Sequence, residues 1–301
     1  MKATTKAYLQ LIRAPNGITA ISNILAAAVI VSAGQIDFSL VFLIFASLFL
    51  YYAGMALNDC LDYREDLQER AFRPLPSGQI KLRHAWILVV CFTLIGLASS
   101  WAFSPQSYTS LYVAGALLLA IIIYDGVIKG GFLGALCMGA CRYFNWLLGA
   151  SFIGVLSLQT SVMPFLVAIP IFVYITALTF LSKQETQADN KKVLFVVSAL
   201  LLTGCGFMFY LALVVFELTA TQQITSLLLL ISCFITVLWR LYQLWQAYTP
   251  TNIQNMIQWM LIAVIPLDAM MVALSGQYIW SLIILTLLVP CRLLSKRLYM
   301  T

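Results

Sequence analysis

Apolar stretches long enough to cross a membrane follow one another along almost the whole of this 301-residue chain. A bilayer core requires about 20 mostly apolar residues per helix, because backbone polar groups find no water there and must pair within the helix. We predict ten such spans, at 17–33, 38–57, 84–103, 108–125, 132–156, 161–181, 192–216, 223–246, 253–274 and 278–294. The first is short and the last two are the hardest to separate, so the sequence predicts an all-α bundle of nine to ten transmembrane helices.

Composition excludes a soluble monomer, a disordered chain and a nucleic-acid-binding protein. Hydrophobic residues make up 62% of the chain and charged residues 9%, whereas soluble domains contain roughly 45–50% and 25% of these classes. Such a chain cannot cover itself with polar surface, and disordered segments are poor in apolar residues. Although the formal net charge is +6, the basic residues are scattered among apolar blocks and form no stripe. We expect a multi-pass membrane protein with a single domain over residues 1–301.

The basic residues indicate how the chain is oriented in the membrane. The predicted spans place both termini on one side, together with the loops 58–83, 126–131, 182–191 and 247–252. All 17 Lys and Arg residues lie in or close to these segments, and the loops on the other side contain none. Because basic residues stay in the cytoplasm, we expect the N-terminus and these loops to be cytoplasmic, at the inner membrane if the protein is bacterial.

The densest group of acidic residues follows the second predicted span. If the helix continues, Asn58, Asp62 and Asp66 stack at i, i+4 and i+8, and Asp59 lies on nearly the same side. Each close carboxylate pair costs on the order of a few kcal/mol in repulsion, so removing one carboxylate is expected to leave stability almost unchanged. Such a cluster requires a cation, and oxygen ligands favour Mg²⁺, which binds carboxylates together with substrate phosphates. The alternative is a helix end whose carboxylates face water.

A second acidic pair and three basic residues could complete such a site. Glu185 and Asp189 are again four residues apart at the end of a predicted span, which offers a second wall for a metal and a phosphate. The basic residues are Arg73, Lys129 and Arg142. Arg142 lies inside the fifth predicted span, where a charged side chain is costly and usually functional. Arginine can bind phosphate through two parallel donors.

Taken together, these residues resemble the signature of the UbiA superfamily of intramembrane prenyltransferases. Residues 58–66 match the pattern NDxxDxxxD, and RPLPSG follows at 73–78. Partial matches are RAPN at 13–16, Tyr124-Asp125 with Lys129 after the fourth predicted span, and Arg142 with Asn145 in the fifth. The resemblance covers most of the chain and weakens after about residue 190.

The resemblance implies a helical bundle around a central cavity that opens sideways to lipid, with Mg²⁺ held on the diphosphate of an isoprenoid donor. The implied metal ligands are Asn58, Asp59, Asp62, Asp66, Glu185 and Asp189. The implied substrate-binding residues are Asn16, Asn58, Arg73, Tyr124, Lys129, Arg142 and Asn145, and the implied catalytic residues are Asp62, Asp66, Arg73 and Lys129. Glu185 departs from the DxxxD pattern of the second motif, and its extra methylene changes the geometry available to a second metal ion.

We therefore expect Mg²⁺-dependent transfer of a prenyl group to a small aromatic, quinone-precursor or polyol acceptor within the bilayer. One alternative is a terpene cyclase or lyase on the same scaffold, without an external acceptor. Another is a transporter or lipid-binding protein, which would suit ten spans with Arg142 and Asp268 inside the membrane. Asp268, in the ninth predicted span, is either a group that handles the acceptor or a proton, or a carboxyl group hydrogen-bonded to a neighbouring helix.

The orientation can be tested by labelling introduced cysteines. Gln35→Cys and Gln68→Cys are placed one at a time in a background without reactive native thiols, and intact cells are treated with an impermeant thiol reagent. We expect the reagent to label position 35 only, because the positive-inside rule places position 68 in the cytoplasm. Labelling at position 68 in intact cells would contradict this orientation, and labelling at 68 after lysis is the control for reactivity.

Overall fold

The computed structural model describes residues 3–104, 106–156, 159, 161–186, 188–296 and 298. Every regular element in these ranges is helical, as the sequence predicts. In chain order they are α1 (Ala3–Leu11), α2 (Ala14–Val31), α3 (Leu40–Leu61), α4 (Tyr63–Glu69), α5 (Leu82–Phe103), α6 (Thr109–Gly126), α7 (Gly131–Ala150), η1 (Ser151–Ile153), α8 (Met163–Val167), α9 (Ile169–Ser182), α10 (Val193–Tyr210), η2 (Leu211–Val215), α11 (Ala220–Gln246), α12 (Pro250–Leu274), α13 (Tyr278–Thr286) and α14 (Leu288–Ser295).

The predicted spans correspond closely to the observed helices. Within the described ranges, nine helical segments are long and apolar enough to cross a membrane. Three of these segments are each made of two consecutive helical elements, α8 with α9, α10 with η2 and α13 with α14. The span predicted at 132–156 is α7 followed by η1. It falls outside the nine because Arg142 and Asn145 lower its hydropathy, yet α7 packs between α2, α6 and α9. The described part of the bundle therefore contains nine strongly apolar helical segments and one more polar helix, α7.

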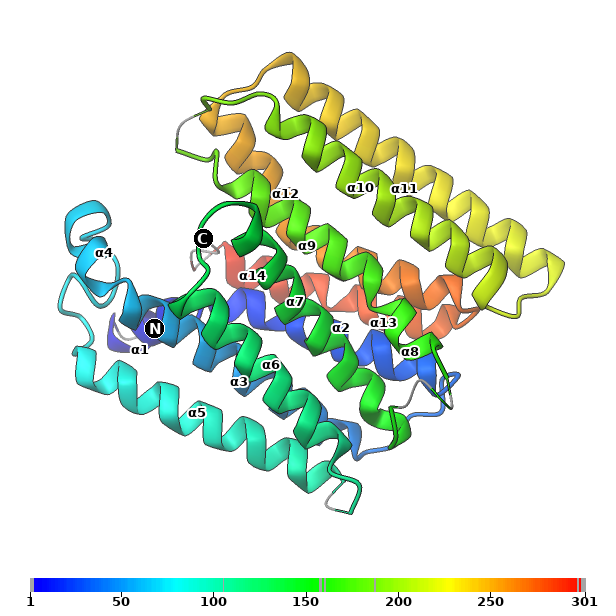
Figure 1. The fold of residues 1–301 in the computed structure, drawn as a ribbon, viewed down its shortest axis with the longest axis horizontal. Coiled ribbons are helices and arrows are strands. Elements are labelled where there is room, and N and C mark those ends of the chain that lie inside the picture. Colours follow the sequence, from blue (N-terminus) through cyan, green and yellow to red (C-terminus); the bar gives the residue numbers. More distant parts are fainter. Residues whose placement is uncertain are drawn as a thin grey trace.

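Helix α2 is the hub of this bundle. It packs against α3, α7, α12 and α14, and 78% of its apolar window is buried. A Cβ atom on Gly149 of α7 would lie 2.7 Å from the carbonyl oxygen of Ile24 in α2, so only glycine allows this close approach. By contrast, α5 and α11 are 11% and 22% buried and lie on opposite outer sides of the bundle (Figure 1). These outer helices have apolar surfaces suited to lipid contact, whereas α2 contacts protein on most sides.

Both chain ends and α4 lie toward the same end of the bundle (Figure 1). At this end the loop after α4 folds back, and its Leu75 and Ile80 are buried against Leu11 and Cys60. A tight turn closes the loop, with the main-chain N–H of Gly78 donating to the carbonyl oxygen of Leu75 at 3.0 Å. Gly78 has a φ of +74°, which glycine adopts without strain. The packing of this loop determines where Arg73, at its start, can reach.

Candidate active site

The helical backbone continues almost without interruption from α3 into α4. The main-chain N–H of Asp62 donates to the carbonyl oxygen of Asn58 at 3.0 Å, and that of Asp66 donates to Asp62 at 2.9 Å. The N–H of Arg70 then donates to Asp66 at 2.9 Å. This i to i+4 ladder places Asn58, Asp62 and Asp66 on one face, which is the arrangement that their spacing predicts.

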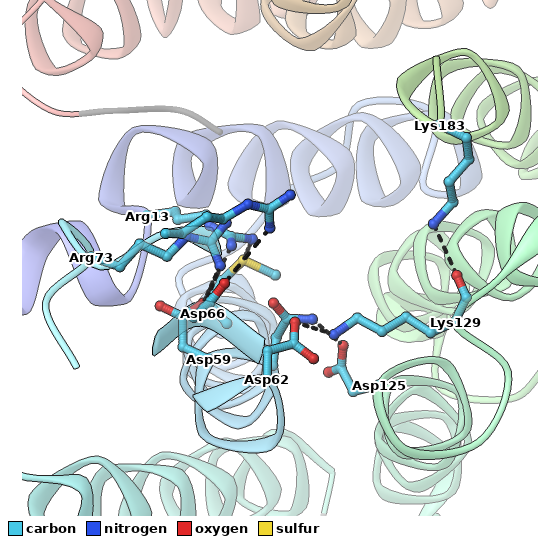
Figure 2. Close-up of polar contacts among 11 residues, drawn as sticks. Arg13, Asp59, Asp62, Asp66, Arg73, Asp125, Lys129 and Lys183 are labelled. Atoms are coloured by element: carbon cyan, nitrogen blue, oxygen red, sulfur yellow. Dashed lines mark hydrogen bonds and ion pairs between the residues drawn. The ribbon is translucent and has the colours of Figure 1, made fainter. Parts of the chain in front are cut away.

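Two buried carboxylates of this face pair with arginines from other segments. Asp66 is 2% exposed, and its carboxylate accepts a hydrogen bond from Arg73 Nη1 at 2.7 Å. Arg70 Nη1 lies 3.8 Å from the other oxygen of Asp66. Asp59 is 5% exposed, and its Oδ1 lies 3.3 Å from Arg13 Nη2 and 3.7 Å from Arg73 Nη1. Figure 2 shows Arg13 and Arg73 approaching this face from the same side. These arginines offset the carboxylate repulsion that the sequence alone predicts.

The other side of the acidic face meets the end of α6 and the loop that follows it (Figure 2). Lys129 Nζ donates to Asp62 Oδ2, and Asn58 Nδ2 donates to Asp125 Oδ1 at 2.9 Å. Lys183 Nζ, from the end of α9, donates to the carbonyl oxygen of Lys129 at 2.9 Å. Partial desolvation and the nearby Lys129 ammonium lower the pKa of Lys183, whereas Glu185 and Asp62 act in the opposite direction. Lys183 therefore lies within electrostatic reach of both acidic motifs.

Arg13 occupies a strained backbone position in the turn between α1 and α2. Its φ is 45° and its ψ is 54°, in the left-handed region that residues other than glycine seldom adopt. Such a conformation costs roughly 1–3 kcal/mol and persists only where its surroundings enforce it. Here the guanidinium contacts Asp59 and also lies 3.3 Å from Met55 Sδ. The strain thus accompanies a side chain directed at the acidic face.

The second acidic motif is less tightly organised than the first. Glu185 is half-buried and Asp189 is exposed. Two hydrogen bonds hold their loop. Gln254 Nε2 of α12 donates to the carbonyl oxygen of Glu185 at 3.3 Å, and Tyr248 Oη, in the turn before α12, donates to the carbonyl oxygen of Asn190 at 3.2 Å. Among the described residues, no ion pair links these two carboxylates to the first motif, and no three acidic, histidine or cysteine side chains converge as a ready metal site.

A cavity begins beside Asp125 and extends between α2, α3, α6 and α7. It is mostly apolar, and its lining residues are Ala20, Ser47, Tyr51, Gly54, Met55, Leu117, Ile121, Tyr124, Asp125, Met138, Cys141, Arg142 and Asn145. Arg142 lies 11 residues into α7, which corresponds to roughly 16 Å along the helix. It is therefore far from the end of α7 that adjoins Lys129.

Most of the predicted site residues thus lie in two places, at the acidic face and in the wall of the cavity. The acidic face brings together Asn58, Asp59, Asp62, Asp66, Arg73 and Lys129. Tyr124, Arg142 and Asn145 line the cavity instead. Asn16 is buried in α2, where its carbonyl oxygen accepts a hydrogen bond from Thr19 at 2.6 Å.

Four residues at the acidic face are absent from the predicted site. They are Arg13, Arg70, Asp125 and Lys183. Arg13 and Asp125 lie within the partial family matches, and Asp125 precedes Lys129 by four residues. These two signals could have indicated both residues. Arg70 follows Asp66 by four residues. The position of Lys183 depends on the packing of α9 against α7, which no local pattern reveals.

The amino-acid sequence matches the family model of the UbiA prenyltransferase family over residues 20–265. A digeranylgeranylglyceryl phosphate synthase from Methanosarcina barkeri is 34% identical over 168 residues, which is 51% of this chain and 57% of that protein. The Methanobrevibacter smithii synthase is 27% identical over 150 residues, or 46% of this chain and 52% of that protein. The matched stretch thus spans little more than half the length of these curated relatives.

Solved structures share the fold over most of the chain. One solved structure comes from a study of digeranylgeranylglyceryl phosphate synthase in membranes. Its TM-score is 0.65 and its sequence identity is 21%, and the match covers 91% of this chain and 100% of that one. A UbiA homologue from Archaeoglobus fulgidus, bound to GPP and Mg²⁺, has a TM-score of 0.62 and 14% identity over 90% of this chain and 99% of that one. With its apolar helices and these relatives, the chain is a multi-pass integral membrane protein.

The pairing of Asp66 generates a prediction about stability in the absence of substrate. Asp66→Ala leaves Arg73 facing Asp59 alone, and breaking a buried ion pair in this way costs about 3–5 kcal/mol. Because Arg73 keeps some contact with water, we expect about 1–3 kcal/mol here. This ion pair corrects the expectation from carboxylate repulsion alone, which is that stability stays almost unchanged. Asp62→Ala is expected to cost less, since the side chains of Asp62 and Lys129 are more exposed, at 17% and 35%. Melting temperatures in detergent measure both variants, and equal melting temperatures for Asp66→Ala and the wild type would contradict the pairing.

Proposed function

Because the chain belongs to the UbiA prenyltransferase family, we propose that it transfers a prenyl group from an isoprenoid diphosphate to a small acceptor within the membrane. The proposal covers residues 1–301 as one transferase domain. The observation that carries it is the position of the acidic face, with its arginines and lysine, beside an apolar cavity that runs into the bundle. The charged diphosphate of the donor requires charged partners, which the acidic face and its basic residues provide. The apolar prenyl chain requires apolar surroundings, which the cavity provides.

The residues of the acidic face fit Mg²⁺. Carboxylate and amide oxygens are hard ligands, and Mg²⁺ is held in proteins by one or two carboxylates plus substrate phosphates. Asn58, Asp59, Asp62 and Asp66 present such oxygens on consecutive helical turns. We propose these four residues as the first metal site, with Glu185 and Asp189 as the second. When bound, Mg²⁺ supplies charge stabilisation for the departing diphosphate.

In this proposal the basic residues act on the diphosphate, and the cavity holds the prenyl chain. Arg73 and Lys129, now paired with Asp66 and Asp62, can turn their donors to the oxygens of the diphosphate and stabilise the charge that builds up there. The prenyl chain extends into the cavity, where the rings of Tyr51 and Tyr124 form part of the wall. Ring faces attract a cation-like allylic fragment, and the surrounding apolar wall keeps water away from it.

The acceptor is proposed from the relatives. Those with the strongest sequence similarity reported above are named digeranylgeranylglyceryl phosphate synthases, which supports a polyol acceptor of the glyceryl phosphate type over an aromatic acid or a quinone precursor. We also propose that the acidic face and the N-terminus lie in the cytoplasm. The basic residues outside the membrane support this orientation.

Diphosphate release by the purified protein tests the reaction. With Mg²⁺ and a panel of prenyl diphosphates, we expect release only when an acceptor is added, and Asp62→Ala should lower the rate by roughly a thousandfold or more. Glu65→Ala is the matched control, because Glu65 is an exposed carboxylate one turn from the site. Release without an acceptor, together with a hydrocarbon product, would instead show a cyclase or lyase, and no release with any donor would favour a transporter.

The second acidic motif has a separate test. If Glu185 and Asp189 hold a metal ion, Glu185→Gln and Asp189→Asn should each raise the Mg²⁺ concentration needed for half-maximal rate, because a neutral amide binds the cation less well. Glu185→Asp restores the usual DxxxD pattern and should keep or raise activity. Glu217→Gln is the control, because Glu217 is an exposed carboxylate in the loop between η2 and α11. Normal turnover of both amide variants at limiting Mg²⁺ would exclude the second metal site.

A further inference from the structure

A buried polar network joins three helices at the level of the cavity. Asp268 of α12 is fully buried, and both of its carboxylate oxygens accept hydrogen bonds from Asn23 Nδ2 of α2, at 2.9 and 2.8 Å. Ser22 Oγ also donates to Asp268. On the other side of Asn23 lie Arg142 and Asn145 of α7. The network thus links a buried carboxylate to a guanidinium through a single asparagine.

The two ends of an asparagine amide are not equivalent, and Asp268 determines which end faces α7. An amide has one donor group and one acceptor oxygen. Both side-chain oxygens of Asp268 accept from the NH₂ group of Asn23, which leaves Oδ1 of Asn23 pointing the other way. There Oδ1 accepts from Arg142 Nη1 at 3.1 Å and from Asn145 Nδ2 at 3.4 Å. If the amide were reversed, its NH₂ group would face two further donors.

Arg142 is fixed by groups that leave it able to bind an anion. Its Nη2 donates to Thr19 Oγ1 at 2.9 Å, and its guanidinium carbon lies 5.7 Å from the centroid of the Tyr51 ring. The ion pairs found in the described part of the chain do not include Arg142. The Asn23 amide therefore links Arg142 to Asp268 by hydrogen bonds, and the guanidinium remains part of the cavity wall.

We infer that Asp268 is a positioning residue, which holds Asn23 so that the Arg142 guanidinium is oriented toward the substrate in the cavity. Asp268 does not itself line that cavity. Of the two interpretations that the sequence allows, the hydrogen-bonded carboxyl group is thus the one observed, with a role in orienting the site. The inference rests on the proposed function only in taking Arg142 as a substrate-binding residue.

Steady-state kinetics of matched variants test this role. Asp268→Asn places an amide donor opposite the Asn23 amide, so Arg142 loses its fixed orientation. We expect KM for one of the two substrates to rise about tenfold while kcat changes less than threefold, and Arg142→Lys should raise KM for the same substrate. Ser22→Ala removes a hydrogen bond to Asp268 without touching Asn23, and should keep KM within twofold of the wild type.

An exchange of the two residues provides the rescue. In Asn23→Asp with Asp268→Asn, the new carboxylate at position 23 can accept from Arg142 on one side and from the new amide at 268 on the other. We expect this double variant to restore KM to within threefold of the wild type. Unchanged KM in Asp268→Asn, or a double variant with a KM no better than that single variant, would overturn the inference.

A stability measurement separates this inference from the proposed function. If the wild-type protein turns over none of the prenyl diphosphates, the proposed function fails, but the network can still be tested by melting temperatures. Asp268→Asn and Arg142→Gln should then show non-additive losses when combined, because both act on the orientation of Asn23. Additive losses would overturn the inference. If Asp268→Asn alone does not fold, the rescued double variant and Arg142→Lys still supply the kinetic comparison.

Discussion

The balance of charge where the helices leave the apolar bundle is the constraint on which the site depends. An ionised carboxylate in apolar surroundings is stable only when it is paired and hydrogen-bonded. Asp59 and Asp66 meet this requirement with arginines, and Asp62 meets it with Lys129. These partners come from the turn before α2, the loop after α4 and the loop after α6. The ion pairs that stabilise the carboxylates of the acidic face therefore also connect the segments that surround it.

This balance has a consequence for the proposed chemistry. Before any substrate binds, the carboxylates and the basic side chains satisfy each other, so the site is organised without a large net charge. In the proposed reaction, a diphosphate and Mg²⁺ would bring charges of opposite sign. The carboxylates would then hold the metal in place of a basic partner, and the basic side chains would turn to the diphosphate. The pairs are thus suited to reorganise with little change in net charge, and the preformed arrangement limits the cost of that change.

Much of the fold follows from the sequence because hydropathy alone determines which segments can lie in a bilayer. The predicted span 38–57 became α3, which extends to Leu61 because its last turn is stabilised by ion pairs and hydrogen bonds as well as by apolar burial. The shared face of Asn58, Asp62 and Asp66 also follows from the sequence, since it depends only on helical periodicity.

The partners of that face could not be predicted in the same way. Arg13, which has a positive φ, pairs with Asp59, 46 residues further along the chain. Asn58 donates a hydrogen bond to Asp125, 67 residues further along. Such contacts depend on how helices pack, and lipid-facing and buried sides of a membrane helix are alike apolar, so periodicity does not reveal the packing. For the same reason the sequence allows two interpretations of Asp268, and only the position of α12 against α2 distinguishes them.

Helix α2 connects the acidic face to the cavity. Helices in a bilayer gain little from burying apolar surface against each other, so small residues and polar contacts decide how they associate. In α2 the alanines at 26, 27 and 28 are completely buried, whereas Thr19 and Asn23 bond to Arg142 of α7. Arg13, at the start of the same helix, pairs with Asp59. Helix α2 therefore sets the distance between the acidic face and the polar residues on the cavity wall. A shift of α2 would change the position of both together.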